Sequence, residues 1–351
     1  MPPTSPSPDL AARRDALALA ALPNVGGARF RELVARFGSA ERALTATADP
    51  GRRAAAATAA ERVLLDAERC GADVWIAGTP PYPPQLFDLP DPPPHLFAVG
   101  AAEVLEGPLV AVVGTRSATA YGERVTRELA GALARAGACI VSGLARGIDA
   151  AAHVAALEVG GRTVAVLGTG IDVPYPTMHA ALHTRIAERG LVLSEHPPGA
   201  RATPGSFPRR NRVIAALAQV TIVVEAGAKS GALITAGHAL DLGRTVAAVP
   251  GPIDTPQAAG SNELLRDGAV VIATLADALA LAGVAGPRPA HAGTLAPDEQ
   301  RVWDLLATGP LDLDTLLSKS ALPVPQCLGA ITTLELAGLV ECALTGEIRR
   351  R

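Results

Sequence analysis

The chain has 351 residues, which at roughly 150 residues per domain suggests two or three domains. Hydrophobic residues make up 49% of the sequence and charged residues 19%, which excludes a mostly disordered chain. The net charge of −3 excludes a globally basic nucleic-acid binder but permits a local basic patch. No stretch approaches the ~20 apolar residues of a membrane-spanning helix, so we expect no membrane association. The four cysteines lack a CxxC pair, which argues against a disulfide scaffold and favours a cytoplasmic protein.

The first 70 residues predict a tail followed by a helical domain. Residues 1–8 are rich in Pro and Ser, and we expect them to be disordered, whereas residues 9–70 are alanine-rich and helical in pattern. The sequence Leu22-Pro-Asn-Val-Gly-Gly27 resembles a helix-hairpin-helix turn, which can offer backbone N–H groups to a DNA phosphate. A plain turn between helices is an equal alternative, because Asn24 stands where such hairpins have glycine. Residues 1–108 carry ten basic and thirteen acidic residues, so we do not assign DNA binding to them.

The middle of the chain predicts a connector and then an α/β domain. Residues 71–108 are dense in proline, which breaks helices and indicates an extended connector. Over residues 109–282, short and continuously apolar runs alternate with helical patterns. Strands that are apolar throughout, each followed by a helix, indicate a mostly parallel sheet covered by helices on both faces. The predicted strands are 109–113, 138–141, 163–167, 191–193, 220–224 and 245–249, and helices are expected near 122–136, 150–157 and 230–240.

Glycine and serine collect where the predicted strands end, at Gly114, Ser142-Gly143, Gly168, Gly170 and Ser230-Gly231. The carboxyl ends of parallel strands meet at one edge of a sheet, and ligands bind there. Strand-to-helix turns expose N–H groups that attract phosphate, and glycine lets a phosphate approach the backbone closely. Each glycine alone can equally serve a tight turn, but together they favour a phosphate-binding edge.

Motifs for catalysis are missing. No GxGxxG follows the first strand, and Gly227-Ala-Lys229-Ser230 lacks the GxxxxGK[ST] spacing, which disfavours a dinucleotide oxidoreductase and an ATPase. The seven histidines show no metal-ligand spacing. Asp149 and His153 could be drawn into a triad with Ser142, but they lie four residues apart on one predicted helix, and no nucleophile elbow is present. We therefore expect no catalytic residues, no metal and no cofactor.

The densest positive charge lies in residues 201–212. This segment has four arginines, no acidic residue and Phe207 in its middle. Arginine neutralises phosphate, and an aromatic ring can stack on an unpaired base. A solvated surface loop is the alternative interpretation.

An ordered series of short motifs runs through the central region. They are Val112-Val-Gly-Thr-Arg116, Tyr121-Gly122, Ser142-Gly-Leu-Ala-Arg-Gly-Ile-Asp149, Thr169-Gly-Ile-Asp172 with Tyr175-Pro176, Phe207-Pro208 with Arg210-Asn-Arg212, Val224-Glu-Ala226, Ser230-Gly-Ala-Leu-Ile-Thr235 and Val249-Pro-Gly251. Together they resemble the DNA-processing protein DprA (Smf) family, closely over about residues 80–282 and loosely in the flanks. Tyr82-Pro-Pro-Gln-Leu-Phe-Asp-Leu-Pro90 is similar to the connector signature of that family.

The resemblance implies a Rossmann-like, doubly wound domain that binds single-stranded DNA and works as a homodimer. It also implies loading of the RecA recombinase onto incoming DNA in natural transformation, without catalysis. Arg116 matches the arginine that contacts the DNA backbone, and Phe207 matches the aromatic residue at the DNA pocket. Residues implied to lie beside them are Ser142 and Gly143 at the phosphate turn and Arg210, Asn211 and Arg212 in the basic motif. With the strand-end residues Gly114, Lys229 and Ser230, these form the predicted DNA site.

Two positions depart from the family pattern. Relatives often have lysine just after the Tyr-Pro and three residues before the Phe-Pro, where this chain has Thr177 and Pro204. Arg185, Arg201 and Arg209 are candidates to compensate. The departures predict DNA binding that is weaker or follows a different path.

The C-terminal part resembles the winged-helix tail of the family. A Gly/Ala/Pro-rich linker over 283–295 precedes a unit over 296–351, with helices near 313–318 and 325–337 and a wing over 340–349. Residues 324–340 contain no Lys or Arg, whereas a helix that reads DNA needs donors for phosphates and base edges. We therefore favour a structural or protein-contact role for this unit.

Two other functions remain as alternatives. A Rossmann-like enzyme that hydrolyses nucleoside monophosphates would carry PGGxGTxxE, of which only Pro250-Gly251 is present. A winged-helix transcriptional regulator is opposed by the uncharged recognition helix.

Overall fold

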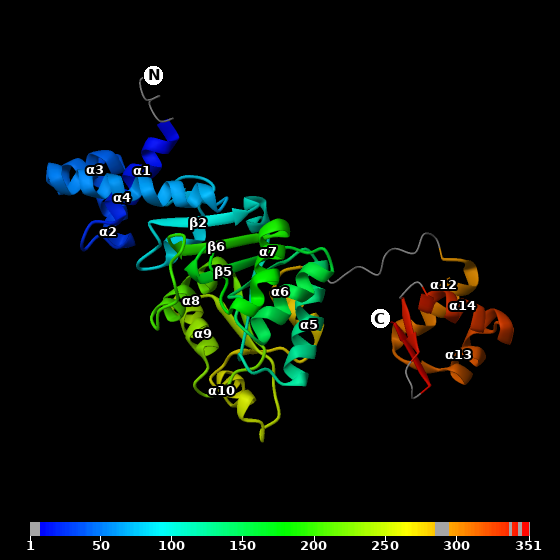
Figure 1. The fold of residues 1–351 in the computed structure, drawn as a ribbon. Coiled ribbons are helices and arrows are strands. Elements are labelled where there is room, and N and C mark those ends of the chain that lie inside the picture. The colour runs from blue at the N-terminus through cyan, green and yellow to red at the C-terminus, as the bar shows by residue number, and fades with distance from the viewer. Residues whose placement is uncertain (1–7, 285–294, 337–338, 343–345, 351) are drawn as a thin grey trace. The chain divides into compact units, whose positions relative to one another are not determined.

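The computed structural model describes residues 8–284, 295–336, 339–342 and 346–350. It divides into two compact units, Met1–Gly286 and Pro287–Arg351, which are described separately (Figure 1). Residues 1–7 of the predicted tail and 285–294 of the predicted linker lie outside the described residues. None of the helices within the described ranges is long and apolar enough to cross a membrane.

The N-terminal part of the first unit is a small helical bundle. Its helices are α1 (Pro8–Ala20), α2 (Gly27–Phe37), α3 (Ala40–Thr47) and α4 (Pro50–Arg69). Two starts follow from side-chain caps, because Ser39 and Asp49 accept the backbone N–H groups three residues further on. The apolar faces share one cluster with Phe97 and Leu167 of the sheet, so the bundle is anchored on the sheet.

A nine-stranded sheet forms the centre of this unit, in the order β1-β2-β6-β5-β4-β3-β7-β8-β9. The strands are β1 (Asp73–Ile76), β2 (His95–Gly100), β3 (Leu109–Val113), β4 (Cys139–Ser142), β5 (Thr163–Gly170), β6 (Leu191–His196), β7 (Val220–Val223), β8 (Thr245–Ala248) and β9 (Val270–Val271). The pairs β1/β2 and β2/β6 are antiparallel, and the others are parallel. The predicted mostly parallel α/β sheet is therefore confirmed. The proline-dense connector is more than an extended segment, because it contributes β1 and β2 to the sheet.

Helices cover both faces of the sheet (Figure 1). One face carries α5 (Ala120–Arg135), α6 (Ile148–Glu158), α7 (Ala180–Arg189) and α11 (Leu275–Leu281), and the other carries α8 (Ser206–Leu217), α9 (Gly231–Asp241) and α10 (Ala259–Arg266). Short 3₁₀ turns are η1 (Pro84–Asp88), η2 (Ala102–Leu105), η3 (Thr177–His179) and η4 (Pro256–Ala258). Alternate residues of β3 pack on opposite faces: Ala111 lies in the core under α8 and α9, and Val112 lies under α5 and α6. This alternation explains why the strand is apolar throughout.

The second unit is a winged helix. It consists of α12 (Pro297–Leu305), η5 (Leu306–Thr308), β10 (Leu311–Asp312), α13 (Leu313–Ser320), α14 (Val324–Leu336), β11 (Val340–Cys342) and β12 (Glu347–Arg350). The three strands are antiparallel in the order β10-β12-β11, and Val302, Leu316 and Leu334 are among the residues of its core. The predicted helices and wing correspond to α13, α14, β11 and β12, although residues 337 and 343–345 lie outside the described ranges.

Candidate nucleic-acid interface

A cavity opens where the order of the parallel strands reverses. The strand β3 lies between β4 and β7, because the chain builds β4, β5 and β6 on one side and then returns to the other side with β7. In such sheets the crevice at this switch point, outside the carboxyl ends of the strands, binds ligands. The turns after β3 and β7 line a cavity of about 670 Å³ here, a volume within the range of ligand sites.

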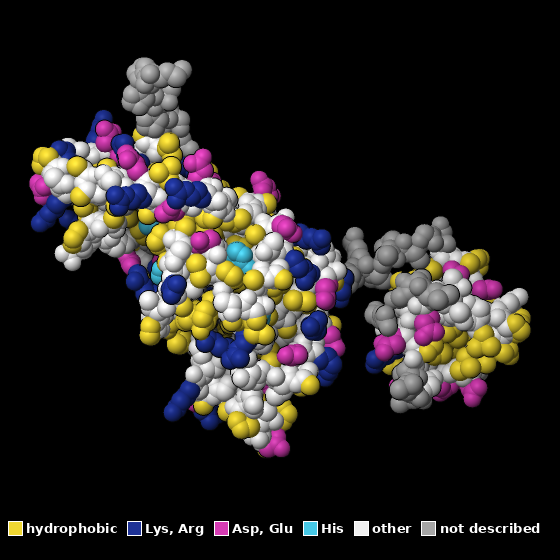
Figure 2. Space-filling view, viewed as in Figure 1, with side chains coloured by type: hydrophobic (Ala, Val, Ile, Leu, Met, Phe, Trp, Pro, Cys, Tyr) yellow, Lys and Arg dark blue, Asp and Glu magenta, His cyan; other side chains and the backbone are white. Residues whose placement is uncertain are grey.

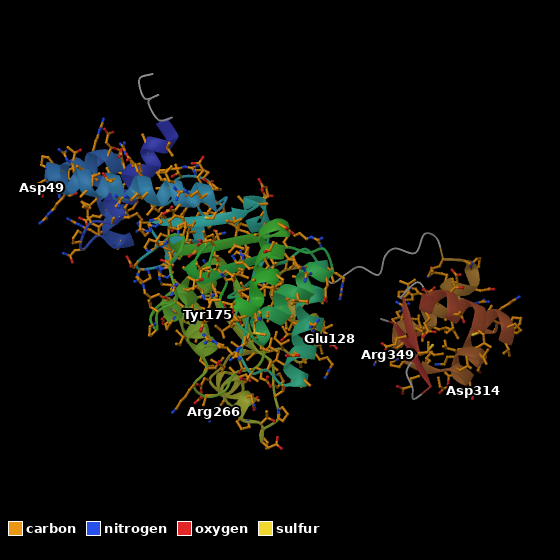
Figure 3. All side chains as sticks on the ribbon, viewed as in Figure 1. Asp49, Glu128, Tyr175, Arg266, Asp314 and Arg349 are labelled. Carbon is orange, nitrogen blue, oxygen red and sulfur yellow. The ribbon has the colours of Figure 1, made fainter. Side chains whose placement is uncertain are left out.

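The wall of the cavity carries an arginine on an aromatic ring. Arg116 is exposed, and the carbon of its guanidinium lies 5.2 Å from the centre of the Phe207 ring. The ring of Tyr175 lies on Phe207 as well, with the two centres 5.0 Å apart (Figure 3 labels Tyr175). Arg116 has no hydrogen bond or ion pair to any residue that the structure describes. A cation that is oriented by an aromatic ring and otherwise unpaired can take an anionic ligand.

The floor of the cavity is a buried polar network. Arg210 is 5% exposed and donates hydrogen bonds to the backbone oxygens of Gly143, at 2.7 Å, and of Val166. Burial lowers the pKa of Arg210 to about 10, so the side chain still carries its charge at neutral pH. Asn211 accepts a hydrogen bond from Arg210 and donates one to the Gly231 oxygen, at 3.1 Å. The network fixes α8 against the turns that form the rest of the site.

This arrangement corrects one interpretation of the basic segment. From Ser206 onward, residues 201–212 are the start of α8 and not a solvated loop. Pro208 fits there because the first turn of a helix does not need its N–H. Arg210 and Asn211 face inward, so one of the four arginines of this segment belongs to the interior.

The start of α9 forms the opposite wall. Ser230 caps this helix by accepting the Ala232 N–H at 3.3 Å, and Lys229 is exposed at the rim. Both residues line the cavity, together with Gly114 of the β3 turn. The positive end of the α9 dipole favours an anion at this terminus.

Two predicted site residues have their polar groups engaged inside the protein. Ser142 is fully buried, and its hydroxyl donates to the Val112 oxygen at 2.7 Å. Arg212 forms an ion pair with Glu195 and donates to the Asp91 oxygen at 2.7 Å. Neither residue lines the large cavity, whereas Gly114, Arg116, Phe207, Arg210, Asn211, Lys229 and Ser230 do, and Gly143 lines a smaller one beside it.

The connector packs against the helix-hairpin-helix-like turn and contacts the start of α2. A carboxylate oxygen of Asp91 accepts the Ala28 N–H, at 3.0 Å, in the first turn of α2. A Cβ on Gly27 would lie 1.5 Å from the Pro92 oxygen, so this glycine is needed for the contact. Arg212 therefore joins α8 to the same stretch of connector that caps the N-terminal bundle.

We expect Arg212→Ala to lower the free energy of unfolding by about 3 kcal/mol and to leave DNA affinity nearly unchanged. The change leaves the largely buried Glu195 carboxylate without its cation, which is a costly state for an ion pair of this burial. Urea unfolding and DNA-binding titrations would measure the two effects. Arg209→Ala is the matched control, because Arg209 is an exposed arginine three residues earlier on the same helix. A stable Arg212→Ala variant with impaired DNA binding would instead restore Arg212 to the DNA site.

His153 is structural. Its Nδ1 lies 2.7 Å from the Thr163 hydroxyl, which itself donates to the Ile140 oxygen, so the ring is the donor in that contact. Burial, assisted by the nearby Arg210 charge, lowers the pKa of His153 to about 3. Asp149, the other candidate for a triad, accepts the N–H groups of Gly143 and Ala145. Burial raises the pKa of Asp149, and the Arg210 charge opposes this effect.

Acid is expected to destabilise the protein through His153. The folded pKa lies below the unfolded value near 6.5, so the unfolded chain binds more protons between these limits. The contribution of His153 to the free energy of unfolding is fully present above pH 6.5. Below that pH it falls by about 1.4 kcal/mol per pH unit. Urea unfolding at several pH values should show a slope that is shallower by that amount in His153→Leu. An unchanged slope would show that His153 is charged in the folded protein.

The three arginines considered as replacements for the lysines missing at Thr177 and Pro204 lie outside the cavities. Arg201 and Arg209 are exposed and Arg185 is half-buried, and none of them lines either cavity. Figure 2 shows Lys and Arg side chains gathered on the lower part of the first unit, close to where Figure 3 labels Tyr175. The sequence did not point to Arg146 or Met178 as site residues, although Arg146 lies within the Ser142–Asp149 motif and Met178 follows Tyr175-Pro176 by two residues.

In the winged-helix unit, the exposed side of α14 is uncharged apart from one glutamate. Val324 is 53% exposed and Leu328 is 42% exposed, one turn apart. Figure 2 shows hydrophobic side chains across one side of this unit. Among the residues that the structure describes, no group of three or more His, Cys, Asp or Glu could hold a metal ion.

Comparison with known proteins identifies the family. The model of the DNA recombination-mediator protein A family matches residues 73–283, the DprA-like N-terminal HHH domain matches 11–68, and the DprA winged helix domain matches 286–343. The chain is a Rossmann-like α/β protein with a winged helix, and it belongs to the DNA recombination-mediator protein A (DprA) family.

Individual relatives support the same family assignment. A putative DNA processing protein DprA of Mycobacterium tuberculosis is 46% identical over 257 residues, which cover 70% of this chain and 66% of the relative. Protein Smf of Escherichia coli is 38% identical over 281 residues, which cover 77% of this chain and 75% of the relative. The matched region spans just under two thirds of the Mycobacterium protein and half of a Synechocystis Smf protein.

Two solved structures share the fold. DprA from Streptococcus pneumoniae matches with a TM-score of 0.68 and 31% identity, covering 79% of this chain and 98% of that one. DprA from Helicobacter pylori, whose structure describes a single-stranded DNA binding mode, matches with a TM-score of 0.55 and 34% identity, covering 59% of this chain and 94% of that one.

Proposed function

We propose that this protein binds single-stranded DNA in the cavity at the switch point of the sheet. The observation that carries the proposal is the exposed guanidinium of Arg116, which is held over Phe207 and has no hydrogen bond or ion pair among the described residues. Arginine binds backbone phosphate, and an aromatic ring stacks on a base, which is available only where the base is unpaired. The single-stranded DNA binding of the Helicobacter relative supports the same reading.

The proposed contacts follow from the lining of the cavity. Arg116 and Lys229 are the rim cations for phosphate, and the α9 terminus at Ser230 adds the positive end of the helix dipole. Gly114 and Gly143 shape the turns, and Arg210 and Asn211 hold the floor. We propose that Ser142 and Arg212 act behind this surface by fixing the turns and the connector.

The proposed role is binding and not catalysis. Asp149 and His153 would be the acid and base of a hydrolytic site, and both are engaged by backbone or side-chain partners within the fold. Incubation with AMP is therefore expected to release no free base. Release of base would favour the nucleotide-hydrolysing alternative.

Fluorescence anisotropy with labelled oligo-dT and a matching duplex, across a salt series, tests the DNA proposal. The wild type should prefer the single strand and lose affinity as salt rises. Arg116→Ala should weaken single-strand binding by at least about tenfold, because it removes the phosphate partner and leaves the ring uncovered. Arg124→Ala is the matched control, since Arg124 lies over Tyr121 in the same way, at 5.6 Å, but outside the cavity. Equal loss in both variants, or no preference for the single strand, would contradict the proposal.

We further propose that the protein acts in the cytoplasm as a homodimer and loads the RecA recombinase onto the bound strand in transformation and recombination. Membership of the recombination-mediator family supports this role. The test is RecA-dependent strand exchange on a single strand already covered by a single-strand-binding protein. The wild type should accelerate exchange, and Arg116→Ala should not. DNA binding without acceleration would refute the loading role alone, and sedimentation of the full chain would decide the dimer.

A further inference from the structure

A second, smaller cavity adjoins the first. Its volume is about 210 Å³, below the range of independent ligand sites, and it shares Arg116, Phe207 and Arg210 with the larger cavity. The Arg116–Phe207 pair therefore borders both cavities.

The rim of the smaller cavity is suited to a nucleotide. Tyr175 is 45% exposed and Met178 is 72% exposed, and both side chains line it. Two large apolar side chains that are left open at the edge of a cavity mark a contact surface. Arg146 is exposed on the same rim and makes no hydrogen bond or ion pair within the described part of the chain. Of the described residues that line this cavity, none is acidic.

The fold holds this rim in place. His179 contacts the Leu144 oxygen through Nδ1, at 2.9 Å, and so joins the turn η3 to the turn that carries Arg146. The Tyr175 ring lies on Phe207 at a tilt of 38°. The Tyr175 ring and the backbone of the turn that carries Arg146 are thus held in place before any ligand arrives, which reduces the entropy lost on binding.

We propose that the smaller cavity binds the nucleotide adjacent to the one in the larger cavity, on the same single strand. The base stacks on Tyr175 and contacts Met178, and Arg146 binds the phosphate on the outer side. Arg116 binds the phosphate between the two nucleotides. This inference rests on the proposed function and extends it, because it assigns a path to the strand and adds Arg146, Tyr175 and Met178 to the DNA site.

Protection from oxidation tests the path without altering the protein. The sequence contains two methionines, Met1 and Met178. The exposed thioether of Met178 should be converted to the sulfoxide by dilute peroxide, which mass spectrometry can follow. Saturating oligo-dT should slow this conversion several-fold, whereas the matching duplex should not, and Met1 provides the internal reference. Unchanged oxidation of Met178 in a saturated complex would overturn the subsite.

Length dependence tests the contacts. Anisotropy with oligo-dT of about 4 to about 16 nucleotides covers the lengths that single-strand sites span. Arg146→Gln and Tyr175→Leu should leave the affinity for the shortest bound oligonucleotide near that of the wild type. They should reduce the affinity for the longest by about five- to tenfold, and Arg146→Gln should lower the salt slope by about one. Arg201→Gln, at an exposed arginine outside both cavities, is the control.

The outcomes separate the two proposals. No binding of any oligonucleotide by the wild type would contradict the proposed function itself. Wild-type binding with an unchanged length dependence and salt slope in both variants would overturn the second subsite and leave the function standing. Equal loss at every length would also overturn it, because these residues would then support the larger cavity only.

Discussion

Replacing Phe207 with alanine is expected to lower the affinity for oligo-dT by about 1–3 kcal/mol, or roughly 5- to 150-fold. The ring touches both Arg116 and Tyr175, so the change removes the proposed stacking surface and the support that orients the guanidinium. Duplex binding should change much less, because paired bases do not offer their faces. Anisotropy with both DNAs at fixed salt measures the difference.

The chain provides a close control for this prediction. Phe87 has the same surroundings, with Arg31 over its ring at 5.6 Å and Tyr82 beside it at 5.4 Å, but it lies in the connector. Phe87→Ala should reduce stability and leave single-strand affinity unchanged, and Phe207→Tyr should keep most of the affinity. If Phe207→Ala and Phe87→Ala weaken binding alike, the effect is one of folding and the stacking role is wrong.

Replacing Gly114 with alanine is expected to destabilise the fold by about 1–3 kcal/mol or more, through overpacking at the centre of the site. A Cβ there would lie 2.5 Å from the Ile148 side chain and 2.7 Å from the Glu225 oxygen. The backbone of this turn is tied down, because the adjacent Thr115 N–H donates to the same oxygen at 2.6 Å. Relief would require β3 and α6 to move apart, and single-strand affinity should fall with stability.

Gly237→Ala is the control for this substitution. Gly237 lies within α9 with no atom within 4 Å of its Cβ position, so alanine there should stabilise by roughly 0.5–1 kcal/mol. Thermal or urea unfolding of both variants gives the comparison. A Gly114→Ala variant with wild-type stability and weakened DNA binding would show that the glycine serves phosphate approach, as its position after a strand suggested.

The local pattern of the sequence determined the α/β class. Continuously apolar runs followed by helices gave the six inner parallel strands to within a few residues, because burial on both faces leaves no polar positions. The local pattern did not predict the strands near the edges of the sheet. The strands β1 and β2 lie among prolines, and β9 has two residues, both exposed, so their pairing depends on neighbours far along the chain.

The sequence also determined which segments would meet, since the motifs at the ends of parallel strands must converge on one edge. Only the tertiary structure decided what each residue does there. Arg210 and Arg212 are two positions apart on one helix, yet one turns into the floor of the cavity and the other toward Glu195 and the connector. Gly114 looked like a phosphate turn, and its surroundings show that packing alone requires a glycine. Arg116 lies over a ring and has no ion-pair partner within the described ranges, which leaves its charge available to a ligand. A side chain's role depends on which atoms lie within a few ångströms of it, and those come from parts of the chain that no local pattern connects.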